Sequence, residues 1–440
     1  LNGDGLVKAL TITVTVFMFI NAASALIKDD LPTFWRILGF AGLVFLGIQI
    51  KYVLNSRKIF DKLKKKIFSS LIQQEYLAWQ QEIFEKLYTN VEYSTLYGRK
   101  YPALIIRDSK NHKYPYDELC ELKECDLPQI QLNKTQKKFL KILGTKLRYP
   151  KMKGFALKKL VINDQGFLER IEAITTNYKQ NLATCHILEW ELYKYYQKSK
   201  KIPDTPILIL ENLPYRKKYH ANREGFKAIL EPKNAYPLLS VQAIIIYKDY
   251  SSDTIPNWKV ILKKRNDKVA IKPGFLQFPP AGGFEVYGTE DDEDDFLLKK
   301  GFDVRSAIFR EYSEEIFDNE EMQIKPDSRE SDYIYKEDNV KELMQSIKEG
   351  KSYLDFMGII VDLSVLRHEI SFLLLIDDAE FSKKTIYGNW EAQDIMSVRL
   401  SELKDYCNTG KMHSSSAALL QLASENKRLK ELGITKEFGS

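Results

Sequence analysis

The sequence contains few cysteines and histidines, and their spacing argues against two common structural devices. Only four of the 440 residues are cysteine and five are histidine. No cysteine belongs to a C-x-x-C pair or has a histidine at ligand spacing, as the positions Cys120, Cys125, Cys185 and Cys407 show. Structural zinc sites need such clustered ligands. The pattern therefore disfavours structural zinc, and it favours a reducing setting over a disulfide framework.

A strong excess of charge of one sign is also absent. The 66 basic and 60 acidic residues leave a net charge of only +6, so the total charge points to no particular partner. The contents of 44% hydrophobic and 29% charged residues are ordinary for a folded protein. A chain of 440 residues is long enough for two or three domains with a sizeable core.

Long apolar runs occur near the start of the chain. Residues 9–27 have no charge and, at about 1.5 Å per residue, nearly cross a hydrocarbon layer of about 30 Å. A second apolar run at 37–50 follows after a short polar stretch. We predict a two-helix transmembrane hairpin over residues 1–55. A signal peptide and a pair of buried helices are the alternatives.

Basic residues crowd the end of the second run and predict the orientation of the hairpin. They are Lys51, Arg57, Lys58, Lys62, Lys64, Lys65 and Lys66. By the positive-inside rule this side is cytoplasmic, so both termini are expected inside. Two spans enclose no pore, so a membrane role would require a homo-oligomer.

Residues 56–235 are expected to form a helical stalk followed by a connecting α/β region. Apolar residues recur at helical spacing over 56–90, including Trp79, Ile83 and Leu87. This helix is an assembly stalk, an interfacial helix drawn to anionic lipid, or a helix that faces the core. Residues 95–235 contain no motif that indicates a function.

Strand and helix patterns alternate over residues 236–435 and predict an α/β domain. Apolar runs at 240–249, 258–267, 356–363 and 369–378 are expected to be strands. Helices are expected over 306–317, 396–406 and 414–432. A Pro/Gly-rich loop and an acidic insert precede the first of these helices.

Three glutamates share one face of the predicted helix 306–317. Glu311, Glu314 and Glu315 are spaced i, i+3 and i+4, so their carboxylates project together and repel one another. A hard cation such as Mg²⁺ would neutralise them, with Arg310 pairing to Glu314. The alternative is a salt-bridged helix on the surface.

The segment "GGFEVYGTE…AIFREYSEEIF" resembles the signature of Nudix hydrolases, G-x5-E-x7-R-E-U-x-E-E-x-G-U. Gly283, Arg310 and the three glutamates match it. Six rather than five residues separate Gly283 from Glu290, and 19 rather than seven separate Glu290 from Arg310. Phe317 replaces the glycine that ends the motif's helix, and Asp318 replaces an aliphatic residue. The resemblance implies a Nudix-like α/β/α sandwich over 236–435 with metal-binding glutamates.

A variant Nudix segment behind two apolar runs is similar to the two-transmembrane Nudix effectors of bacterial CBASS antiphage systems, the SMODS-associated NUDIX family. This resemblance implies an effector at the inner membrane. A nucleotidyltransferase would supply a cyclic oligonucleotide, and its binding would drive the hairpins to oligomerise and disrupt the bilayer. The other hypothesis is a membrane-tethered, Mg²⁺-dependent Nudix hydrolase of a nucleoside diphosphate derivative.

Candidate ligand contacts come from the segments before the glutamate helix and from one later aromatic residue. Lys263, Lys264 and Arg265 end a predicted strand, and Phe278 and Trp390 have rings that stack on bases in other proteins. Solvated lysines and core aromatic residues are the alternatives. Gly282, Gly283 and Arg310 complete the predicted ligand site.

Overall fold

The computed structural model divides the chain into two compact units, residues 1–66 and 67–440. The residues that it describes all belong to the second unit. They are 74–108, 119–123, 131–144, 153–251, 257–266, 269, 272, 274–286, 298–299, 301–319 and 333–438. The predicted boundary at residue 235 falls inside this unit.

The expected fold class and localisation need correction. Within the described part of the chain, no helix is both long and apolar enough to cross a bilayer. The described residues therefore contain neither of the two spans expected of a multi-pass protein of the inner membrane in contact with the bilayer. The expected spans at 9–27 and 37–50 lie outside the described residues. What the structure shows is a mixed α/β domain.

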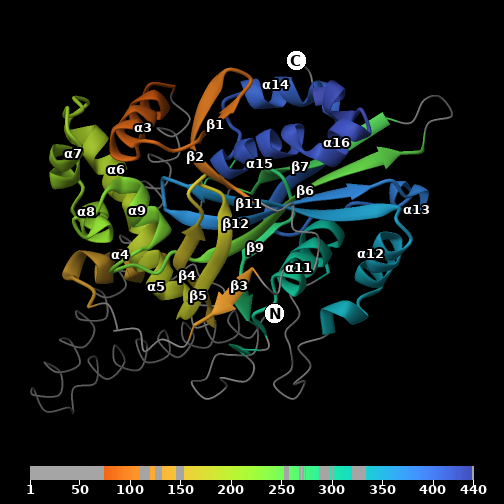
Figure 1. Cartoon of the computed structure of the whole chain (residues 1–440), viewed down its shortest axis with the longest axis horizontal. Helices are drawn as coiled ribbons and strands as arrows, with labels where there is room; N and C mark the ends of the chain where they lie inside the picture. The colour runs from red at the N-terminus through yellow and green to blue at the C-terminus, as the bar shows by residue number, and fades with distance from the viewer. Residues whose placement is uncertain are drawn as a thin grey trace, which may run out of the picture. The chain divides into compact units, whose positions relative to one another are not determined.

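A nine-stranded sheet forms the centre of this domain (Figure 1). Its strand order is β1 (Tyr93–Leu96), β2 (Arg99–Arg107), β11 (Ser352–Asp362), β12 (Arg367–Ile376), β6 (Leu239–Asp249), β7 (Asn257–Arg265) and β13 (Ala392–Arg399). Two short strands lie off this path, β8 (Leu276–Gln277) beside β7 and β9 (Ala281–Gly283) beside β6. The pair β12 and β6 is parallel, with Ile370 opposite Val241.

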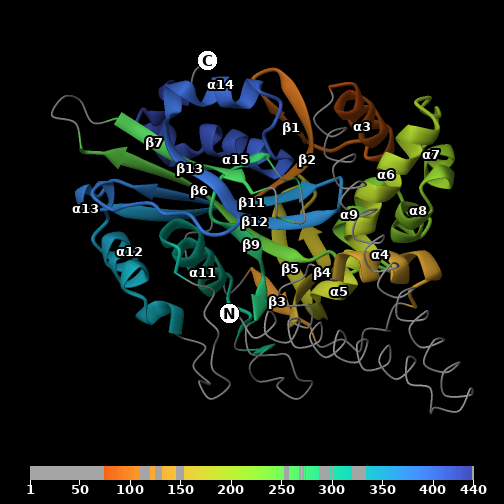
Figure 2. The same cartoon turned by 180° about the vertical axis from the view of Figure 1, so that it is seen from behind.

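Helices cover both faces of the large sheet, as Figures 1 and 2 show. On one face lie α11 (Val304–Phe317) and α12 (Asp338–Lys348), and on the other lie α14 (Leu403–Asn408), α15 (Ser414–Glu425) and α16 (Lys427–Glu431). Alternate residues of β6 enter two separate cores, Val241 and Ala243 on one side and Ile244 and Ile246 on the other. Because both faces are buried, these strands are continuous apolar runs rather than alternating ones.

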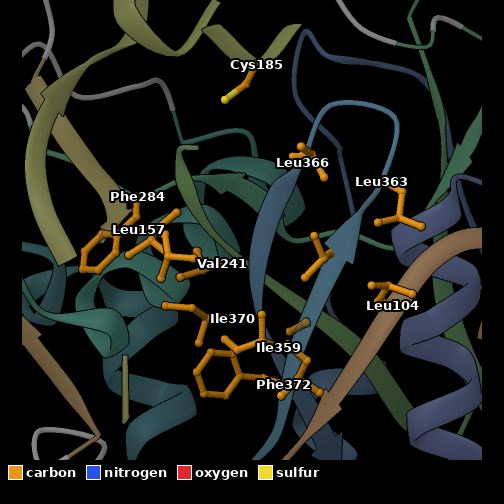
Figure 3. Close-up of a cluster of buried hydrophobic side chains, with 14 of the residues drawn as sticks. Leu104, Leu157, Cys185, Val241, Phe284, Ile359, Leu363, Leu366, Ile370 and Phe372 are labelled. Carbon is orange, nitrogen blue, oxygen red and sulfur yellow. The ribbon is translucent and has the colours of Figure 1, made fainter. Parts of the chain in front are cut away.

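A smaller sheet packs beside the first. Its order is β10 (Glu285–Val286), β4 (Lys153–Ile162), β5 (Leu168–Asn177) and β3 (Cys120–Leu122). Only Phe284 separates β9 of the large sheet from β10 of the small one. Figure 3 shows the shared core, in which Leu157 and Phe284 lie near Val241 and Ile370. The two sheets are therefore joined both by a continuous segment of the chain and by the packing of their side chains.

The helical part of the unit packs against the same core. It contains α3 (Gln74–Leu87), α4 (Lys134–Gly144), α5 (Tyr178–Asn181), a π-helical segment (Leu182–His186), α6 (Ile187–Lys198), α7 (Pro206–Asn212), α8 (Pro214–His220) and α9 (Gly225–Leu230). A short helix, α13 (Ala379–Ser382), follows β12. In α3 the residues Trp79, Ile83 and Leu87 are buried, so this part of the expected stalk helix faces the core. The rest of that helix, 56–73, lies outside the described residues.

The expected helix over 396–406 is wrong in its first half. Residues 392–399 form β13, which pairs antiparallel with β7 from Lys259 to Arg265. Pairing with the edge of the sheet outweighs local helix propensity here. The helix expected over 414–432 is present as α15 and α16, which meet at Asn426.

Candidate functional site

Helix α11 contains the three glutamates and has defined ends. At its start the Asp303 side chain accepts a hydrogen bond from the backbone N–H of Arg305. At its end Asp318 adopts a left-handed conformation with φ of 54°. Glycine ordinarily takes this position. The conformation that stops the helix is thus at 318, one residue after the position where the Nudix signature has its glycine.

Both sides of α11 are buried, which excludes a solvated surface helix. Its apolar residues Ile308, Phe309, Tyr312 and Ile316 lie in the core. The three glutamates are buried as well, with Glu315 only 2% exposed. Buried carboxylates need compensating partners.

Glu315 has a buried lysine as its partner. The Lys263 ammonium of β7 forms an ion pair with the Glu315 carboxylate, and the two side chains are 1% and 2% exposed. The second carboxylate oxygen accepts a hydrogen bond of 2.8 Å from the backbone N–H of Ala281. Burial raises the pKa of Glu315, while Lys263 opposes that shift. The carboxylate is therefore fixed from two sides by groups of the chain itself.

Arg310 and Glu311 form the second half of the arrangement. An Arg310 nitrogen donates to Glu311 at 2.8 Å, whereas the expected contact with Glu314 is 3.9 Å. Arg310 also donates to the carbonyl oxygens of Gly283 and Glu285, each at 2.8 Å. It thereby attaches α11 to the corner where the chain passes from one sheet to the other. Burial raises the pKa of Glu311, and Arg310 opposes that shift.

The glutamates as placed do not fit a bound metal ion. No group of three or more His, Cys, Asp or Glu side chains among the described residues is arranged to hold one. Glu311 and Glu315 point to Arg310 and Lys263, so protein cations already neutralise the face where Mg²⁺ was expected. Glu290 and the acidic insert lie outside the described residues.

Further charged and polar groups lie near the helix. Arg367, at the start of β12, donates to Ser240 Oγ at 2.5 Å and lies 3.4 Å from Glu369. Its pKa is raised by Glu369, Tyr178, Glu285 and Glu311, against the opposing effect of burial. Burial raises the pKa of Tyr178 to about 12, with Glu285 acting in the same direction and Arg367 and Arg265 against it. These groups come from both sheets and converge near α11.

The sequence did not identify most of these groups. Arg367, Glu369 and Tyr178 belong to no motif. Glu391, which lies 3.9 Å from Lys263, precedes β13 in an ordinary polar stretch. One signal was present in the sequence. The charged residues Arg367 and Glu369 stand before an apolar run, and this pattern could have indicated a strand whose polar end is buried. Their convergence depends on β12 lying next to β6, far away in sequence.

The predicted ligand contacts are divided by the fold. Five of them lie around α11, namely Gly282, Gly283, Arg310, Lys263 and Arg265. The Arg265 guanidinium there donates a hydrogen bond to the side chain of Gln277. Lys264, which follows Lys263 in β7, is half-buried. Phe278 is fully buried in the core on the opposite face of the sheet, and Trp390 is 44% exposed. Their roles as ligand contacts remain predictions.

Comparison with known proteins gives distant structural similarity only. No family model matches the sequence, and no curated protein matches it. A Nudix hydrolase from Alicyclobacillus acidocaldarius is similar over 44% of this chain and 94% of its own, with 16% identity and a TM-score of 0.26. A Nudix hydrolase from M. smegmatis is similar over 45% of this chain and 87% of its own, with 12% identity and a TM-score of 0.24. These distant structural neighbours are Nudix hydrolases.

Proposed function

We propose that this domain binds a phosphate-bearing nucleotide without a metal ion and does not hydrolyse it. The observation that supports the proposal is the buried ion pair between Lys263 and Glu315. In a Nudix hydrolase, as the resemblance implies, carboxylates of this helix bind the metal that activates water. Here one of the corresponding carboxylates, Glu315, is paired with the Lys263 ammonium of the chain itself.

The Lys263–Glu315 pair is hard to displace. Breaking a buried ion pair by removing one partner costs about 3–5 kcal/mol, because the other charge stays buried without compensation. A metal that took Glu315 from Lys263 would leave the buried ammonium with only Glu391, at 3.9 Å, as its carboxylate partner. It would also compete with the hydrogen bond from Ala281 to the same carboxylate. The face therefore favours a structural use of the glutamates over a catalytic one.

Arginines near α11 supply the recognition chemistry. The planar guanidinium matches two phosphate oxygens at once, and it does so better than the compact lysine ammonium. We assign Arg367 and Arg265 as the phosphate contacts, since both lie near enough to Tyr178 to act on it electrostatically and Arg367 is anchored by Ser240 of the large sheet. As the ligand we propose the cyclic oligonucleotide of the antiphage resemblance, made by a nucleotidyltransferase. Its binding would promote self-association of the chain.

The test is a binding titration of the full chain with cyclic di- and trinucleotides and with nucleoside diphosphate derivatives, in EDTA and in millimolar Mg²⁺. We expect one cyclic nucleotide to bind equally in both buffers and to increase the assembly size in analytical ultracentrifugation. Arg367→Gln should weaken binding at least tenfold. Arg399→Gln, at an exposed position on β13, is the matched control. Absence of binding across the panel would refute the proposal.

The second candidate is the Mg²⁺-dependent hydrolase of a nucleoside diphosphate derivative. One observation favours it, because burial raises the pKa of Glu311 and Glu315, and an acid so tuned can act as a general base. Phosphate release that requires Mg²⁺ and disappears in Glu315→Gln would establish this function in place of the first.

A further inference from the structure

A cavity of about 380 Å³ lies away from α11, between α3, the start of β2 and the segment that enters α15. It shares no lining residue with the site around the glutamates. Figures 1 and 2 show α3 beside β1 and β2 in both views. The volume is within the range of small-molecule sites. The cavity is thus large enough for a ligand of mononucleotide size.

The lining of the cavity is cationic and contains no carboxylate. Arg99, Lys100 and Lys272 are its charged residues. Lys100 bonds to Glu85 at 2.7 Å and Lys272 bonds to Asp362 at 2.6 Å, so these two are neutralised by groups outside the lining. Arg99 has no carboxylate within ion-pair distance in the described part of the chain. Its guanidinium lies 5.4 Å from the centre of the Tyr101 ring.

Two further groups facing the cavity are hydrogen-bond donors. Gln80 of α3 lines it, is 1% exposed, and has an amide nitrogen with no hydrogen-bond partner among the described residues. Ser414 also lines it and is the first residue of the 12-residue helix α15. The first N–H groups of a helix lack partners within the helix and favour anions. In α15 the Ser415 N–H is already capped by the His413 side chain, so the N–H of Ser414 is the group offered to the ligand. An unpaired guanidinium, a buried amide and a helix start thus face one space.

We propose that this cavity binds an organic phosphate of mononucleotide size, with the phosphate at Arg99 and the start of α15. A buried donor without a partner is destabilising, so Gln80 favours a ligand rich in acceptors. The apolar walls, including Leu77 and Met412, suit the uncharged part of the ligand. The proposal is independent of the function proposed for α11.

The test is calorimetric titration of the full chain with AMP, adenosine and inorganic phosphate. We expect saturable AMP binding, with adenosine at least tenfold weaker because it lacks the phosphate. Arg99→Gln should weaken AMP binding at least tenfold, and Arg99→Lys should weaken it less because the charge is kept. Gln80→Leu should weaken it too.

A control variant tests whether the effect is specific to this cavity. Arg399→Gln changes an exposed arginine elsewhere and should bind AMP as the unaltered chain does. Circular dichroism verifies that each variant is folded. Failure of AMP to saturate at millimolar concentration overturns the proposal. Unchanged AMP binding by folded Arg99→Gln also overturns it.

Discussion

The backbone of Gly282 lies directly against the side chain of Glu311. A Cβ atom added to Gly282 would be 2.0 Å from the carboxyl carbon of Glu311. No side chain fits into that space, so the close approach of β9 to α11 requires glycine. The second glycine of the pair is less constrained, because a Cβ on Gly283 would be 3.1 Å from the end of Glu285.

Gly282→Ala should therefore destabilise the chain by about 1–3 kcal/mol, the usual range for overpacking. The reason is displacement of Glu311 from Arg310. Urea denaturation followed by circular dichroism measures the effect. Gly283→Ala is the matched control and should cost less, since only the flexible end of Glu285 has to move. Equal costs at both positions would contradict this account.

Lys263→Met should destabilise the chain by roughly 3–5 kcal/mol, because Glu315 would remain buried without its cation. The double variant Lys263→Met with Glu315→Gln should recover most of that loss, since no uncompensated charge is left. Denaturation of both single variants and the double variant gives the coupling energy. Lys264→Met, one residue along β7, should change stability by less than about 0.5 kcal/mol.

Glu189 should make stability depend on pH. Burial raises the pKa of this carboxyl to about 7. Between about pH 4.3 and pH 7 the unfolded chain has lost this proton while the folded chain retains it. The folded state binds more protons, so this group lowers stability as pH rises through that window and has no further effect above it.

The Glu189→Gln variant has no carboxyl group at this position. Its free energy of unfolding, compared with that of the unaltered chain, should therefore rise by up to roughly 3 kcal/mol from pH 4.5 to pH 8. Denaturation of both proteins across that range is the measurement. Glu82→Gln alters a side chain that is 56% exposed and should leave the difference flat. A pH-independent effect of Glu189→Gln would contradict the assignment.

The left-handed backbone conformation of Asp318 should determine how substitutions at this position change stability. With φ at 54°, Asp318→Gly removes a steric cost and should raise stability by up to about 1 kcal/mol. Asp318→Val places a branched side chain in the same conformation and should lower stability by roughly 1–2 kcal/mol. Thermal unfolding of the two variants checks both signs. A stabilising valine would show that the helix ends differently.

The sequence predicts the regular elements near the glutamates because each has a local signal. The helix expected over 306–317 is α11 with two further residues at its start, and the apolar run at 240–249 is β6 with one more. Spacing also places Glu311 and Glu315 on one face. These properties depend on neighbours within one or two turns.

The partners of those glutamates depend on the fold and have no local signal. Lys263 lies 52 residues before Glu315 and was expected to contact a ligand from the end of a strand. Its side chain faces α11 only because β7 lies beside β6 in the large sheet. The same reasoning applies to Arg367, whose position depends on the parallel pairing of β12 with β6. Charge compensation between distant segments is a tertiary property, and periodicity within a segment does not encode it.

The connection between β9 and β10 through the single residue Phe284 has a mechanical consequence. Phe284 is 1% exposed and packs on Phe155 and Phe302, while Arg310 grips the carbonyl groups on either side of it. Helix α11 is thus hydrogen-bonded on both sides of the single residue that connects the two sheets, and so it is linked mechanically to both. The two hydrogen bonds of Arg310 couple the position of α11 to both β9 and β10. Movement at the glutamates would thus reach the small sheet without an intervening loop to absorb it.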